Sequence, residues 1–172
     1  MKIDRRFVGI AMSVLLAVSI AVPASAEGEA KKKPLTIKSP ATFEKGVVLR
    51  EAVKAECQLP TKLPAYIQDF AKKRSEVTLA EKIGESKGRT LSVVFEEVRE
   101  AGTAGPKAVT VKGELRDGGK VVGTIRARRS TIGGPLGAFG GACGILHRCL
   151  KALGKDLAGW AEKPEMNVEM MN

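Results

Sequence analysis

The sequence has few of the residues on which most hydrolytic enzymes and metal sites rely. It contains one histidine, His147, and three cysteines among 172 residues. A Ser–His–Asp or Cys–His arrangement would therefore have to use His147. Zinc sites need three or four ligands, and one histidine without a dense carboxylate cluster does not supply them. We therefore expect no metal, no cofactor and no enzymatic activity.

Aromatic residues and long apolar runs are scarce as well. Aromatics make up 4% of the chain, with one tryptophan and one tyrosine, which is thin for a stacking platform on single-stranded nucleic acid. Beyond residue 22, no apolar run approaches the roughly 20 residues that span a bilayer. These two absences argue against nucleic acid as a partner and against a transmembrane segment in the mature chain.

Residues 1–26 have the three-part pattern of a secretory signal peptide. A charged start is followed by an apolar run over residues 7–22 and by small residues at −3 and −1 of a cut after Ala26. An uncleaved signal anchor is the alternative, but the run is short and ends at Pro23. We expect cleavage and a periplasmic or secreted location.

The mature chain would be basic. Removal of residues 1–26 leaves 146 residues, with 26 basic and 18 acidic side chains and a formal net charge of +8. Outside the cytosol, such a domain meets lipid headgroups, lipopolysaccharide and acidic glycans, and its summed field attracts it to them. The same charge also keeps a small domain soluble, so composition alone does not distinguish binding from solubility.

Two segments have the spacing of amphipathic helices. Leu63, Ile67 and Phe70 recur at intervals of four and three residues and predict a helix over 61–74. Residues 142–162 carry a continuous apolar stripe and predict a second helix. The members of that stripe are Leu146, Leu150, Leu153, Leu157 and Trp160.

Alternation of apolar and polar residues predicts a strand at 91–96 and a hairpin over 107–129. The Asp-Gly pair at 117–118 supplies the turn, because both central positions of a tight hairpin turn need φ above zero. Short apolar pieces at 46–49 and 77–79 are further strand candidates.

These elements predict an α+β fold. We expect a two-layer sandwich in which two helices cover one face of an antiparallel sheet of three to five strands. The single folded domain would span residues 47–164. Residues 27–46 are polar and interrupted by prolines and are expected to be a flexible lead-in, and residues 165–172 are expected to be a disordered tail.

The sheet face opposite the helices would be left to solvent or to a partner. In the hairpin this face carries four cations, Lys112, Arg116, Arg126 and Arg128. We expect these four side chains to form the binding surface for a protein partner or for an anionic membrane or lipopolysaccharide surface.

Cys57, Cys143 and Cys149 would remain after export, where an oxidising compartment favours one disulfide and one free thiol. In a helix over 142–162, Cys143 and Cys149 lie about 9 Å apart along the axis, whereas a disulfide needs Cα atoms within about 7 Å. Cys57 should therefore pair with one of them. Cys143 is preferred if both helices begin at the same end of the sheet, and Cys149 stays open. A true strand at 77–79 would make the helices antiparallel and remove that preference.

Two alternative functions depend on single features. A small periplasmic enzyme could use a Cys–His pair, because His147 follows Cys143 by four residues. The methionines of the tail, at 166–171, are soft ligands that could hold Cu(I). Glu96 and Glu97 are adjacent on a predicted strand, so they are expected on opposite faces and form no acid–base pair.

The C-terminal part of the chain carries a resemblance. A hairpin leads into a glycine-rich run over 131–141, and the following helix contains Leu-Gly-Lys-Asp-Leu-Ala-Gly-Trp at 153–160. With these motifs the chain resembles, over about residues 47–164, a family of small uncharacterised proteobacterial exported proteins. More distantly it is similar to α+β domains of envelope-assembly lipoproteins, although residue 27 is Glu and not a lipid-accepting cysteine. The resemblance implies a place in the bacterial envelope and no assigned activity.

We therefore expect an exported, non-catalytic envelope protein that acts as a binding or assembly module. Its partner would be a protein or an anionic envelope surface.

Overall fold

The computed structural model describes residues 32–83, 88–100, 106–131 and 141–172. The predicted signal peptide lies outside these residues and stays a prediction. At the centre of the fold is an antiparallel ladder of three long strands, β4 (Arg89–Glu100), β5 (Lys107–Asp117) and β6 (Lys120–Thr131). The predicted hairpin is therefore confirmed. Its turn lies one residue later than predicted, because Gly118 and Gly119 have φ values of +55° and +82°, a conformation that glycine adopts without steric cost.

Four shorter strands extend this ladder into a seven-stranded mixed sheet. On one side, β1 (Lys33–Lys38) lies between β4 and β3 (Ser75–Ala80), parallel to both, and β2 (Thr42–Phe43) continues along β4. On the other side, β7 (Val168–Met171) runs parallel to β6. The α+β class is confirmed. The expectation of a purely antiparallel sheet of three to five strands is wrong, because both ends of the chain add strands in parallel.

The structure also corrects the expected boundaries. Residues 33–38 and 42–43, expected to be part of a flexible lead-in, belong to the sheet, because Leu35 and Ile37 alternate with polar residues and are buried in the core. The tail is held by β7 and by the Glu165 carbonyl, which accepts hydrogen bonds from the Thr124 backbone N–H and from Trp160 Nε1. The candidate strand at 46–49 is wrong, since this segment passes without strand pairing into the first helix.

Three helices form the second layer: α1 (Glu51–Cys57), α2 (Leu59–Ala71) and α3 (Gly141–Glu162). Both predicted helices are confirmed, with α2 starting and ending earlier than 61–74. Pro64 lies inside α2 and has no N–H to donate to the Pro60 carbonyl. The Ala41 backbone N–H donates to that carbonyl instead, at 2.9 Å. The segment after β1 therefore satisfies the acceptor that Pro64 leaves without a helical donor.

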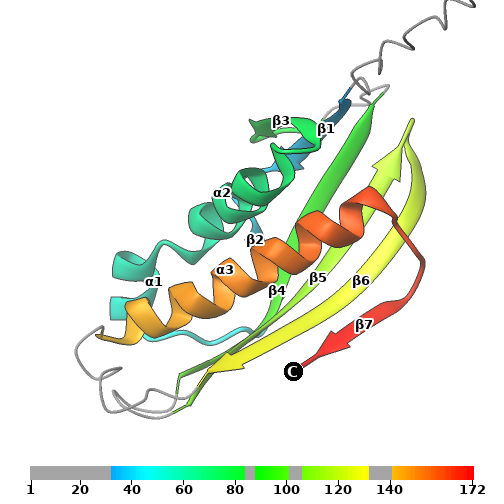
Figure 1. Cartoon of the computed structure of the whole chain (residues 1–172). Coiled ribbons are helices and arrows are strands. Elements are labelled where there is room, and N and C mark those ends of the chain that lie inside the picture. Colours follow the sequence, from blue (N-terminus) through cyan, green and yellow to red (C-terminus); the bar gives the residue numbers. More distant parts are fainter. Residues whose placement is uncertain (1–31, 84–87, 101–105, 132–140) are drawn as a thin grey trace, which may run out of the picture. The chain divides into compact units, whose positions relative to one another are not determined.

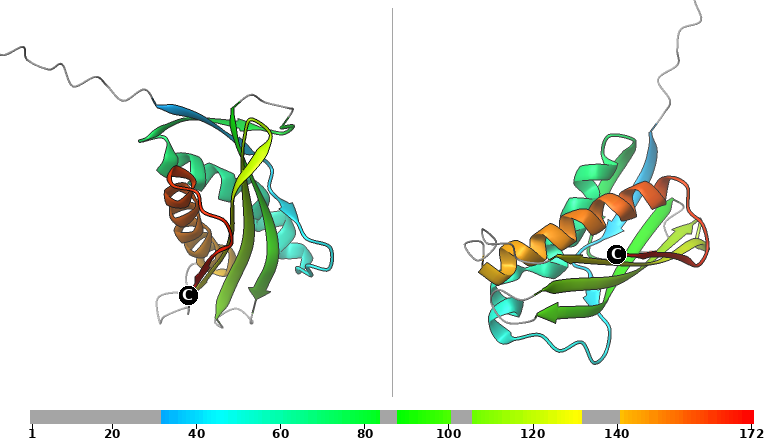
Figure 2. Two further views of the ribbon diagram at one scale, coloured as in Figure 1. Left: turned by 90° about the vertical axis from the view of Figure 1, so that its right-hand side faces the viewer. Right: turned by 60° about the horizontal axis from the view of Figure 1, so that its bottom comes forward.

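Helices α2 and α3 lie side by side across one face of the sheet (Figures 1 and 2). The inward residues of β4, β5 and β6 and the predicted stripe of α3 are buried together in one core. Close approach of α3 depends on Gly113 and Gly123, where an added Cβ would lie 3.3 Å from Leu157 and 2.8 Å from Trp160, respectively. The core therefore occupies one face only, and the opposite face of β4–β6, the outer face, is left for polar side chains.

The helices begin at the same end of the sheet. A disulfide joins Cys57, at the end of α1, to Cys143 in the first turn of α3, with 4.9 Å between the Cα atoms. Further along, Gly154 of α3 packs against Tyr66 of α2, so the two helices run in parallel. The preferred Cys57–Cys143 pairing is confirmed, and Cys149 is free and buried.

The strand at 77–79 is also confirmed, as part of β3, yet it does not make the helices antiparallel. Antiparallel helices would require β3 and β4 to run in opposite directions. Instead, β1 lies between them and pairs in parallel with each. Strands β3 and β4 therefore run in the same direction, and the two helices run parallel to each other.

Two glycines of α3 give a test of the helix packing. At Gly154 an added Cβ would lie 2.7 Å from Tyr66 Cβ and 3.0 Å from its carbonyl carbon, whereas at Gly159 nothing lies within 4 Å. We expect Gly154→Ala to lower the free energy of unfolding by about 1–3 kcal/mol through overpacking. Gly159→Ala should raise it by about 0.5–1 kcal/mol, because alanine is the better helix former. Urea unfolding measures both, and equal effects would contradict the close contact.

Candidate binding surface

The outer face of the sheet contains the candidate site. A hollow of about 490 Å³ crosses β4, β5, β6 and β7 on this face, within the range of ligand sites. Among the four predicted residues, Lys112 and Arg126 line the hollow. Arg116 lies near the hairpin turn, and Arg128 follows Arg126 on the same face of β6. The apolar part of the lining comes from Val94 and Val168, with the backbone around Gly113 and Ile125.

The cations of the hollow are paired with carboxylates. Lys112 Nζ lies 2.8 Å from Glu44 Oε1 and 3.3 Å from Glu96 Oε1. Arg126 Nε lies 2.6 Å from Glu96 Oε2. A single carboxylate, Glu96, therefore joins two strands by bridging the cations of β5 and β6. Its side chain is only 20% exposed, so this network is less screened than an ordinary surface pair.

The pairing shifts the acidity of these groups in a consistent direction. Burial on its own would raise the pKa of Glu96, but hydrogen bonds from Arg126 and Lys112 outweigh burial and lower it. Hydrogen bonds to Glu44 and then to Glu96 raise the pKa of Lys112. Both shifts favour the charged forms, so the network is fully ionised at neutral pH.

A β-bulge explains why two adjacent glutamates share this face. The register of β4 against β5 shifts between Phe95 and Glu97. Glu96 then contacts Lys112, while Thr110, two residues before Lys112 on β5, donates through Oγ1 to Glu97 at 3.5 Å. The expectation that Glu96 and Glu97 lie on opposite faces is therefore wrong, because an extra residue in a strand breaks the period-two alternation.

The remaining predicted cations differ in their pairing. Arg116 Nε lies 2.7 Å from Glu114 on its own strand and is half-exposed. Arg128 is different, because its Nε is buried and has no hydrogen-bond partner among the described residues. An unpaired buried donor costs free energy until an acceptor reaches it. Arg128 is therefore the predicted residue with unmet hydrogen-bonding capacity.

The structure adds site residues that sequence reasoning missed. Glu44 comes from the segment after β2, Asn167 immediately precedes β7, and Glu169 lies within β7. Asn167 donates through its backbone N–H to Thr124 Oγ1 at 2.8 Å, which fixes the rim of the hollow. No local pattern identifies these residues, because Glu44 meets Lys112 across 68 positions of sequence.

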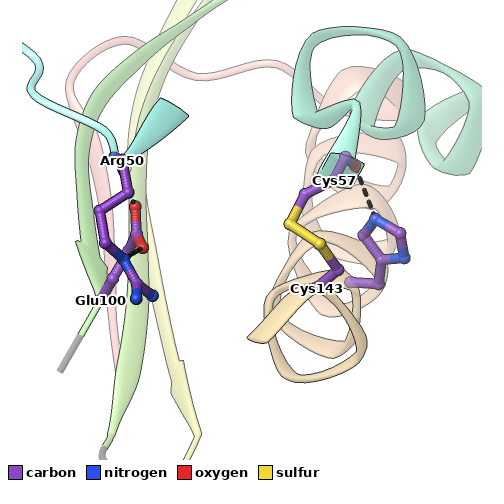
Figure 3. Close-up of a disulfide and its surroundings, with 5 residues drawn as sticks. Arg50, Cys57, Glu100 and Cys143 are labelled. Carbon is purple, nitrogen blue, oxygen red and sulfur yellow. Dashed lines mark hydrogen bonds and ion pairs between the residues drawn. A yellow bond between two sulfur atoms is a disulfide. The ribbon is translucent and has the colours of Figure 1, made fainter. Parts of the chain in front are cut away.

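Cys143, the cysteine of the predicted Cys–His pair, forms a disulfide with Cys57 (Figure 3). Cys143 is oxidised, and His147 Nε2 donates to the Cys57 carbonyl at 2.7 Å. The imidazole thus ties α3 to the end of α1. Nearby, Arg50 and Glu100 pair at 2.6 Å. The free thiol of Cys149 is buried in the core, and burial raises its pKa, which disfavours the nucleophilic thiolate.

The methionines of the tail do not form a common site. Met170 packs against the core, whereas Met166 and Met171 are exposed. Met170 and Met171 are adjacent in β7, so their side chains point to opposite sides. Within the described residues, no group of three His, Cys, Asp or Glu side chains is placed to hold a metal.

Comparisons with known proteins place the fold. A crystal structure described only as an uncharacterized protein is similar at a TM-score of 0.51 and 13% identity, covering 74% of this chain and 92% of the other. Protein XCC0632 from Xanthomonas campestris, of the DUF330 family, is similar at a TM-score of 0.52 and 13% identity, covering 75% and 83%. No family model and no curated protein matches the chain. The fold is thus shared with uncharacterised proteins, one of them bacterial.

Acid titration tests the role of Glu96. Its pKa is lowered in the folded state, so its contribution to stability is present above its unfolded value, about pH 4.3, and is lost as the pH falls through the folded value. Glu96→Gln should lower the free energy of unfolding at pH 7 by about 1 kcal/mol. The difference from wild type should shrink below about pH 4. Denaturant unfolding from pH 3 to 7 measures it.

Glu56→Gln is the matched control, because Glu56 is exposed on α1. A constant difference between wild type and Glu96→Gln across the titration would contradict the ion-pair network.

Proposed function

We propose that this chain is an exported, non-catalytic binding module of the bacterial cell envelope, and that the outer face of its sheet receives a protein partner. The observation that carries the proposal is the hollow on that face, with charged groups of both signs held in fixed positions around an apolar lining. Such a combination of apolar surface and oriented polar groups is typical of binding sites.

The charge distribution favours a protein over an anionic surface as the partner. The cations Lys112, Arg116 and Arg126 each contact a glutamate, so the field of this face is weak for attracting a membrane. A polypeptide carries both signs and can exchange ion pairs with the face. Arg128, half-buried on the same face of β6, makes no ion pair among the described residues, and its guanidinium would supply the contact for a carboxylate of the partner.

Two features support export. The Cys57–Cys143 disulfide links segments 86 residues apart, and structural disulfides persist in oxidising compartments. The pattern of residues 1–26 predicts a signal peptide. Among the described residues, no helix combines the length and apolar character needed to cross a membrane.

Site-specific photo-crosslinking in the source organism tests the binding face. A photoreactive residue at Thr124 or Ser92, which line the hollow, should give a discrete adduct with a partner protein. The same residue at Lys62, exposed on α2, is the control and should give none. Adding Arg128→Gln should weaken the adduct from Thr124, because the partner loses a charge-assisted hydrogen bond.

The proposal is supported only if the adduct forms from the outer face and not from the control position on α2. Adducts of equal yield from Lys62, or an adduct that Arg128→Gln leaves unchanged, would contradict a partner on the outer face. Circular dichroism of each variant confirms that the fold is retained.

Thiol alkylation tests the absence of Cys–His catalysis. In the native protein without reductant, we expect iodoacetamide to modify none of the three cysteines, because two are bridged and Cys149 is buried. In denaturant, only Cys149 should react until a reductant is added. Mass spectrometry counts the modifications. Rapid alkylation of Cys149 in the native protein near pH 7 would favour the enzyme alternative.

A further inference from the structure

A second hollow lies away from the outer face, where the end of β6 meets α3. Its volume is about 440 Å³. From β6 it is lined by Arg129, Ser130 and Thr131, and from α3 by Arg148, Lys155 and Asp156. Arg129 and Arg126 are three residues apart on β6, so they point to opposite faces of the sheet. This hollow is therefore distinct from the site of the proposed function.

The charges of this hollow do not cancel. Arg129 Nε lies 2.7 Å from Asp156 Oδ2, and both side chains are largely buried. That pair neutralises the one carboxylate side chain among the described lining residues. Arg148 and Lys155 are exposed, and within the described residues neither makes an ion pair. Counted over side chains, the described lining residues thus carry two positive charges without a carboxylate partner. Asn172 also lines the hollow, and its backbone oxygen accepts a hydrogen bond from Ser130 Oγ at 3.2 Å.

The spacing of these cations suits one ligand. Arg148 and Lys155 are seven residues apart on α3, about two turns, and therefore share one side of the helix at a separation of about 10 Å along its axis. Long, flexible side chains at that separation can converge on a group held between them. The Arg129 guanidinium, oriented by Asp156, borders the same hollow.

We propose that this hollow binds a phosphate-type oxyanion, presented either as the free anion or as the headgroup of an anionic phospholipid. Arginine donates two parallel hydrogen bonds to phosphate oxygens, and lysine adds a compact charge. Thr131, two residues after Arg129 and therefore on the same side of β6, adds a hydroxyl donor, whereas the Ser130 hydroxyl already donates to the Asn172 backbone oxygen. A tetrahedral dianion uses this many donors, whereas a single carboxylate has too few oxygens to use them all.

The helix that borders this hollow carries several of the domain's exposed cations. On the outer face, the cations of the hollow are matched by glutamates of neighbouring strands. On α3, Arg148, Lys151 and Lys155 are exposed at successive turns, and no ion pair forms with them in the described part of the chain. These exposed cations attract anions to the side of α3 that borders the second hollow.

The test compares two double variants of the mature chain with equal loss of charge. Arg148→Gln with Lys155→Gln removes the free cations of the hollow. Lys151→Gln with Lys163→Gln removes two exposed cations of the same helical region that do not line it. Inorganic phosphate is titrated into each ¹⁵N-labelled protein, and sedimentation with phosphatidylglycerol-containing vesicles forms the second arm. Phosphatidylcholine vesicles are the reference.

For wild type we expect saturable shifts of the amides of Arg148, Ala152 and Ser130 with phosphate, binding to the anionic vesicles, or both. The hollow variant should weaken this binding about tenfold or more, while the control variant changes it less than about twofold. Saturable phosphate binding identifies the free anion as a source, and binding to vesicles alone identifies the lipid headgroup. Equal losses in both double variants, or no binding of wild type to either probe, would overturn the proposal.

Discussion

The parallel insertion of β1 between β3 and β4 is the constraint on which the rest of the structure depends. Because β1 pairs in the same direction with both neighbours, β3 and β4 run in parallel, and the long antiparallel ladder then returns β6 in the direction of β4. Helix α2 precedes β3 and helix α3 follows β6, and these two strands run in the same direction. The two helices must therefore run parallel to each other. Only then do Cys57 and Cys143 meet at a common end.

Helix packing on one face determines where the polar groups can lie. The inward side chains of β4, β5 and β6 are buried in the core. Gly113 and Gly123 let Trp160 and Leu157 of α3 approach the sheet closely. Charged residues at alternate positions are therefore forced onto the outer face, where neighbouring strands place opposite charges side by side. Cross-strand neighbours on a sheet lie about 4.5–5.5 Å apart at Cβ, so cations and carboxylates there pair with one another before they can attract a ligand.

Local periodicity was enough to predict the hairpin, the stripe of α3 and the face that carries Lys112, Arg116, Arg126 and Arg128. These features repeat within a few residues, and burial of one side enforces them. Parallel pairing of β1 and β7 was out of reach, because a strand of four to six residues such as Val168–Met171 carries little signal without its distant partner. The bulge at Glu96 and the pair of Glu44 with Lys112 depend on three-dimensional register in the same way.

Net charge proved a poor guide to the local charge of the outer face for a related reason. Lys112 and Arg126 belong to the basic surplus by count, yet Glu96 and Glu44 offset them in space. On α3, by contrast, Arg148, Lys151 and Lys155 make no ion pair among the described residues, because the solvent side of this helix has no neighbouring strand to supply carboxylates at a fixed spacing. A sheet face and a helix face of equal composition therefore differ in what they attract. The first favours a partner that can exchange ion pairs, and the second favours a ligand that brings its own negative charge. Because alternate residues of β6 serve opposite faces, the two ligands could be held at the same time by one strand.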